Sequence, residues 1–131
     1  MKTGTVGLFA AALVAGGVAQ AHHSFSATYD ENAQVQIEGK LVQFMFRNPH
    51  SFVHVMAPDE HGELQRYAVE WGGAGTLDRQ GVKRDTLKVG DHVVITGNPG
   101  RNAVDRRVRM QTLQRPADDY TWGTAAGEDF D

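Results

Sequence analysis

Two consecutive histidines, His22 and His23, directly follow a stretch with the features of a protease cleavage signal. Residues 19–21 read Ala-Gln-Ala, the pattern at which secretory signal peptides are cut, and a basic residue and an apolar run over residues 6–18 precede them. Cleavage after Ala21 would make His22 the first residue of the mature chain. An amino-terminal histidine chelates one ion with its α-amine and its imidazole, which are nitrogen ligands of the kind that Cu(II) favours. The sequence therefore predicts export and, as a hypothesis, a metal site at the new amino terminus.

His50 and Glu70 are the other two residues expected at this site. His50 follows Asn48-Pro49, a dipeptide typical of turns, and is expected on the rim of a small β-barrel. If the amino-terminal arm folds back to that rim, the amine and ring of His22 and the ring of His50 supply three nitrogens to one ion. Glu70 ends a later strand, where its carboxylate could bind the ion or orient an imidazole. The predicted metal site consists of His22, His23, His50 and Glu70, with copper preferred and zinc as the second choice.

The same residues also have purely structural interpretations, which the sequence leaves open. His50 could hold its turn through a ring nitrogen while the two amino-terminal histidines stay unbound. Glu70 could accept a backbone N–H of the Gly72-Gly73 turn, or serve as a general base. His54 lies about 13 Å along the strand from His50, at about 3.3 Å per residue, so these two are not expected to share an ion.

Composition narrows the classes of function. The 131 residues carry 13 basic and 16 acidic side chains, a net charge of −3 that does not suit a nucleic-acid binder. Cysteine is absent from the sequence, which excludes disulfides, thiol catalysis and zinc sites built on thiolates. The apolar run of the signal segment is too short for a comfortable membrane span, which needs about 20 residues, and no second apolar segment of that length follows it. We expect a periplasmic or secreted protein.

Strand-like alternation and turn residues divide the mature chain into a short barrel domain and two flanking segments. The expected elements are a signal peptide over 1–21, an extended arm over 22–34, a barrel domain over 35–115 and an acidic, disordered tail over 116–131. Strands are predicted over 35–46, 51–57, 64–71, 92–97 and 106–114, with a helix near Thr76–Gln80 capped by Thr76 and a turn or helical piece over 85–88. Gly39 marks a bend in the first strand. This order predicts an all-β fold, an OB-like five-stranded Greek-key barrel with one short helix, although a small β-sandwich would have similar strand spacing.

Four segments in this order resemble a family of exported bacterial proteins. They read HHSF over 22–25, NPHSFVHV over 48–55, YAVEWGG over 67–73 and DTLKVGD over 85–91, and together they are similar to the family DUF6152. Residues on positions that match the family pattern are His22, His23, Ser24, Phe25, Asn48, Pro49, His50, Glu70, Leu77, Gly81, Leu87, Gly90 and Asp91. Tyr67 stands where the family usually has tryptophan. The resemblance covers about residues 21–115 and implies an OB-like exported domain, without a known activity.

Two functions from different classes remain. The first is a small periplasmic binding module that holds copper or a similar transition metal. The second is a non-metal interaction domain that docks a protein partner or a small ligand on the barrel rim. An enzyme is the weaker expectation, because the sequence holds no phosphate loop, nucleophile elbow or H-E-x-x-H pair. The sequence identifies no natural ligand and no oligomeric state.

Overall fold

Alternating apolar and polar residues form the strands that make up most of the computed structural model, which describes residues 25–130. The strands are β1 (Val35–Met45), β2 (Ser51–Pro58), β3 (Leu64–Trp71), β4 (His92–Pro99), β5 (Arg107–Arg115) and β6 (Tyr120–Trp122). Helix α2 (Ala74–Arg79) lies between β3 and β4, and the short 3-10 turns η1 (Ala103–Asp105) and η2 (Pro116–Asp118) flank β5. Residues 25–28 form a further helical turn ahead of β1.

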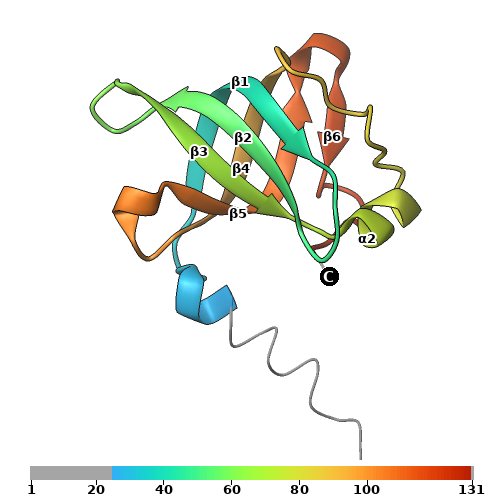
Figure 1. Ribbon diagram of the computed structural model, residues 1–131, viewed down its shortest axis with the longest axis horizontal. Helices are drawn as coiled ribbons and strands as arrows, with labels where there is room; N and C mark the ends of the chain where they lie inside the picture. Colours follow the sequence, from blue (N-terminus) through green and yellow to red (C-terminus); the bar gives the residue numbers. More distant parts are fainter. Residues whose placement is uncertain (1–24, 131) are drawn as a thin grey trace, which may run out of the picture.

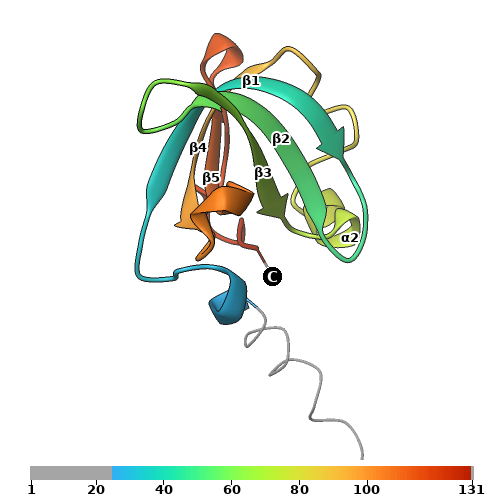
Figure 2. The ribbon, with the colours of Figure 1, turned by 60° about the vertical axis from the view of Figure 1, so that its left-hand side comes forward.

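The strands close into a barrel through a short parallel pairing. The sheet order is β3-β2-β1-β4-β5-β6, and β3 pairs in addition with β5. This closing contact joins Ala68–Glu70 to Arg107–Arg109 in parallel, whereas the other strand pairs are antiparallel. Five strands in this order, with a helix between the third and the fourth, are typical of the OB-fold. The predicted fold is therefore confirmed, and Figures 1 and 2 show the curled sheet from two sides.

The barrel interior is filled by every second residue of each strand, whose side chain points inward. In β2, Val53 and Val55 are fully buried, while the alternate residues Phe52 and His54 face outward. Gly39 lies where β1 changes partner, since the next residue, Lys40, pairs with both β4 and β2. A Cβ atom at Gly39 would lie 2.0 Å from the carbonyl oxygen of Met56, so only glycine allows the two strands to cross this closely.

The helix differs from its prediction in how it begins. Gly73, rather than Thr76, is the N-cap residue of α2, and no side chain of its own caps it. The segment after the helix forms a turn, one of the two outcomes expected for residues 85–88. None of the helices within residues 25–130 has the length and apolar composition that crossing a bilayer requires.

The segment after β5 was expected to be an acidic, disordered tail, whereas residues 116–122 of it form the turn η2 and strand β6. Strand β6 pairs with the end of β5, and Trp122 is 1 % exposed within the hydrophobic core. The indole N–H of Trp122 donates a hydrogen bond of 3.0 Å to the side-chain oxygen of Gln80, just beyond α2. The packed domain therefore extends beyond Arg115, because the indole of Trp122 is part of the hydrophobic core.

Candidate functional site

The turn between β1 and β2 is fixed by the beginning of helix α2. The backbone N–H of Ala74 donates to the carbonyl oxygen of Arg47 at 3.0 Å, and the N–H of Gly75 donates to the side-chain oxygen of Asn48 at 3.2 Å. These are N–H groups that a helix cannot satisfy internally. The turn thus caps the helix, and the helix in turn holds His50 in place.

Close backbone packing explains the Gly72-Gly73 pair at the end of β3. A Cβ atom at Gly73 would lie 2.5 Å from the carbonyl oxygen of Pro49, whose peptide bond with Asn48 is cis. The backbone N–H of Ser51 donates to the carbonyl oxygen of Gly72 at 3.0 Å. The two segments that the sequence analysis singled out, around His50 and around Glu70, are consequently in direct backbone contact.

Glu70 is a buried carboxylate on the outer face of the barrel. Its neighbours Val69 and Trp71 are fully buried in the core, so the Glu70 side chain points outward, yet this side chain is only 9 % exposed. Oε1 lies 2.6 Å from Nδ1 of His50, and Oε2 accepts a hydrogen bond of 3.1 Å from Nη2 of Arg107. A buried charge requires partners of this kind to offset its desolvation.

The amino-terminal arm covers Glu70 with Tyr29. Tyr29 is fully buried and forms an isolated antiparallel bridge with Gly100, beyond the end of β4. Its hydroxyl donates a hydrogen bond to Oε2 of Glu70. Burial raises the pKa of Tyr29, and the hydrogen bond and negative charge of Glu70 raise it further, so the phenol stays protonated as a donor. The described part of the arm, expected to be extended, begins instead with a helical turn over residues 25–28, which Figure 2 shows ahead of β1, and Tyr29 follows this turn.

The ring of His50 lies where the two ends of the described chain meet. Phe25 stacks on it at a centroid distance of 5.2 Å and an interplanar angle of 18°, and Phe130 meets it edge-on at 5.6 Å. The guanidinium of Arg109 lies 4.3 Å from the ring centre of Phe25 and 4.7 Å from that of Phe130. The His50 side chain remains 33 % exposed. The ring is therefore packed against two aromatic rings but is still reached by solvent.

The His50–Glu70 bond determines which ring nitrogen is available for chemistry. In the neutral ring, the proton that Glu70 accepts resides on Nδ1, which leaves the lone pair on Nε2. Nε2 forms no hydrogen bond with any residue in the described range 25–130. Such an imidazole suits a metal ligand or a proton acceptor.

The structure brings together two of the four predicted site residues. His50 and Glu70 are in contact, whereas His22 and His23 lie outside the described residues. Within 25–130, no group of three or more histidine, cysteine or acidic side chains is arranged to hold a metal. His54 is engaged elsewhere, since its Nδ1 accepts a hydrogen bond of 3.1 Å from Nε of Arg66.

Four further residues at the site were not found from the sequence: Phe25, Tyr29, Arg107 and Phe130. Arg107 could have been predicted as a partner of Glu70. A glutamate that is buried at a strand end needs a cation, and the arginines of β5 alternate with core residues. The positions of the aromatic residues were harder to predict, because the sequence around a single aromatic residue in a polar terminal segment does not indicate which surface it packs against.

The comparison with protein families agrees with the segments around these residues. Residues 11–109 match the model of a family of unknown function, DUF6152. The match includes the predicted cleavage point, the turn that holds His50 and the strand that ends near Glu70. The comparison with curated proteins gives no match. The chain belongs to the DUF6152 family.

Proposed function

We propose that the mature protein is a small exported binding module of the periplasm that holds Cu(II), with Zn(II) as the second choice. The ion is bound by the amine and imidazole of His22 together with His23 and His50, after cleavage behind Ala21. Glu70 orients the ring of His50. No catalytic step is part of this proposal.

One observation carries the proposal, namely the 2.6 Å contact between Nδ1 of His50 and Oε1 of Glu70. Metal-binding histidines characteristically donate their second ring N–H to a carboxylate or carbonyl group, which fixes the ring and raises its basicity. The contact leaves Nε2 of His50 as the donor atom for an ion.

The bonds of Glu70 favour an orienting role over direct coordination. Oε1 is engaged by His50, and Oε2 accepts hydrogen bonds from both Tyr29 and Arg107. A metal on Glu70 would displace one of these donors and would approach the positive charge of Arg107. We therefore assign Glu70 to the support of His50.

Covalent geometry supports the participation of the amino terminus. Phe25 stacks directly on the ring of His50. Because consecutive Cα atoms are about 3.8 Å apart, the Cα atom of His23 is at most about 7.6 Å from that of Phe25. This short connection to Phe25 supports the proposal that the amine of His22 reaches the ring of His50.

Copper titration of correctly processed protein tests the proposal. The full chain is exported, an intact mass beginning at His22 is verified, and Cu(II) affinity is measured by competition with a chromophoric chelator. His50→Ala and a chain with one extra alanine ahead of His22 should each bind at least about tenfold more weakly, and Glu70→Gln about 10- to 100-fold more weakly.

The control variant is His61→Ala, which removes a histidine whose side chain is 77 % exposed in the turn between β2 and β3. It should bind copper as the wild type does. Equal affinity of the wild type, His50→Ala and the alanine-extended chain would refute the proposal and favour the non-metal interaction domain.

A further inference from the structure

A cavity of about 630 Å³ opens at the end of the barrel near η1. It exists because two strand pairings stop short. The pairing of β1 with β2 begins only at Lys40, and that of β3 with β5 begins only at Ala68. At this end of the barrel, no strand pairing therefore joins residues 35–39 to β2 or residues 64–67 to β5. The volume falls within the range of about 300 to 1,000 Å³ typical of small-molecule sites.

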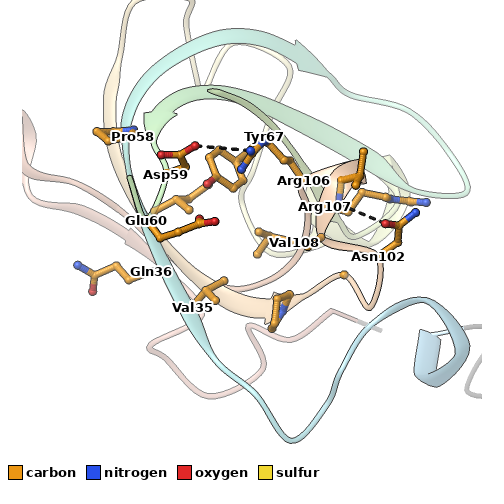
Figure 3. Close-up of a pocket in the computed structure, with 15 residues that line it drawn as sticks. Val35, Gln36, Pro58, Asp59, Glu60, Tyr67, Asn102, Arg106, Arg107 and Val108 are labelled. Atoms are coloured by element: carbon orange, nitrogen blue, oxygen red, sulfur yellow. Dashed lines mark hydrogen bonds and ion pairs between the residues drawn. The ribbon is translucent and has the colours of Figure 1, made fainter. Parts of the chain in front are cut away.

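The side chains around this opening are mainly apolar. Figure 3 shows that Val35, Tyr67 and Val108 surround the opening and that the side chain of Glu60 points into it. Val104 on η1 also lines the cavity and is 85 % exposed, a large apolar exposure for a residue placed in a capped turn. An apolar ligand in the cavity would bury apolar surface that is now exposed to solvent.

The cavity wall is held in a fixed shape. The carboxylate of Asp59 accepts backbone hydrogen bonds from His61 at 2.8 Å and from Glu63 at 3.0 Å. Arg106 adopts a left-handed backbone conformation with φ 45°, and its guanidinium crosses the Tyr67 ring at 5.9 Å to reach Asp59 at 3.5 Å. A non-glycine residue in this conformation persists only where its surroundings hold it.

The charges that line the cavity indicate a neutral ligand. Its two cations are already paired, Arg106 with Asp59 and Arg107 with Glu70. Glu60 is 73 % exposed at its side chain and stays in water. No unpaired cation is therefore left among the described lining residues to select an anion. The Tyr67 hydroxyl makes no hydrogen bond to another described residue and offers one polar contact.

We infer that this cavity binds an uncharged, largely apolar small molecule that forms one hydrogen bond with the hydroxyl of Tyr67. The cavity shares only Arg107 with the residues around His50, so this binding does not depend on copper. A failure of the copper proposal would leave it unaffected.

The test uses two fluorescent probes of matched shape. N-phenyl-1-naphthylamine is neutral, and 8-anilino-1-naphthalenesulfonate has the same rings with an added sulfonate. The neutral probe should bind the wild-type protein at least about tenfold more tightly, since the sulfonate would lose hydration without gaining a free cation. Amide NMR shifts induced by the neutral probe should map to η1, the start of β1 and Tyr67.

Two exposed valines provide a matched pair of variants. Val104→Asp should weaken binding of the neutral probe about fivefold or more. Val89→Asp alters a valine that is 72 % exposed and lies outside the cavity lining, and it should leave binding within about twofold. The inference is overturned if the neutral probe does not bind, if the sulfonate binds equally well, if the two variants behave alike, or if the NMR shifts map elsewhere.

Discussion

Glu70 at the end of β3 and His50 in the turn before β2 are joined by a 2.6 Å contact between Oε1 and Nδ1. Each is also anchored separately, Glu70 by Tyr29 and Arg107, and His50 by the stacked ring of Phe25. The contact joins strand β3 to the β1–β2 turn, and Tyr29 and Phe25 attach the amino-terminal arm to both residues.

Replacing Glu70 should destabilise the fold. Glu70→Ala leaves Arg107 without its carboxylate in a largely covered site, and we expect the free energy of unfolding to fall by about 3 kcal/mol in urea denaturation. The control is Glu38→Ala, which removes an exposed partner of His92 at 2.8 Å and should change stability by less than about 1 kcal/mol. Similar losses in both variants would contradict the role assigned to Glu70.

The hydroxyl of Tyr29 should contribute measurably to folding. Tyr29→Phe keeps the buried ring and removes one hydrogen bond to a charged acceptor, so the free energy of unfolding should fall by about 2 kcal/mol. Tyr120→Phe serves as the comparison, because the Tyr120 hydroxyl has no hydrogen-bond partner within residues 25–130. If thermal or urea unfolding does not separate the two variants, the Tyr29 bond is not stabilising.

His54 should make the fold less stable in mild acid. Burial, followed by the positive charges of Arg66 and Arg47, lowers the pKa of His54 from its usual value of 6.5. Below that pH the unfolded chain binds a proton at His54 that the folded chain does not, so this contribution to stability is complete above 6.5 and is lost as the pH falls. Urea titrations at pH 7 and pH 5 should show a smaller loss for His54→Gln than for the wild type.

The exposed His61 provides the matched control for this pH dependence. His61→Gln should retain the wild-type loss of stability between pH 7 and pH 5. If His54→Gln shows the same loss as His61→Gln, another group is responsible for the acid sensitivity.

Trp122 should prove to be part of the folded core. Trp122→Ala removes a ring that is 1 % exposed and should lower the free energy of unfolding by about 3 to 5 kcal/mol. Phe130→Ala removes a partly exposed ring from the surface around His50 and should cost clearly less. Hydrogen exchange should protect the backbone of β6, and rapid exchange there would contradict its place in the sheet.

The strands were predictable because each of them alternates between the core and the solvent. Strand β3 has the predicted bounds, and the other four barrel strands differ by one or two residues. The bend at Gly39 and the turn at Asn48-Pro49 were also predicted from the sequence. A close backbone crossing and a tight turn each accept few residue types.

Other features could not be predicted because they depend on contacts between distant segments. Strand β6 has only three residues, too few for a periodic pattern, and is defined by the space that Trp122 fills. The sequence left open whether the carboxylate of Glu70 bonds the nearby glycine turn or a histidine ring, and its partners come from the arm, the β1–β2 turn and β5. Only the closed barrel brings these segments together.

The most direct test of the copper site is a count of the imidazoles bound to one Cu(II) ion in correctly processed protein. Electron spin-echo envelope modulation detects the remote ring nitrogen of each bound histidine. We predict that the wild type shows more than one bound imidazole and that His50→Ala loses one of them, while His61→Ala retains the wild-type spectrum. An unchanged imidazole count in His50→Ala would contradict the proposal that His50 and the mature amino terminus share a metal ion.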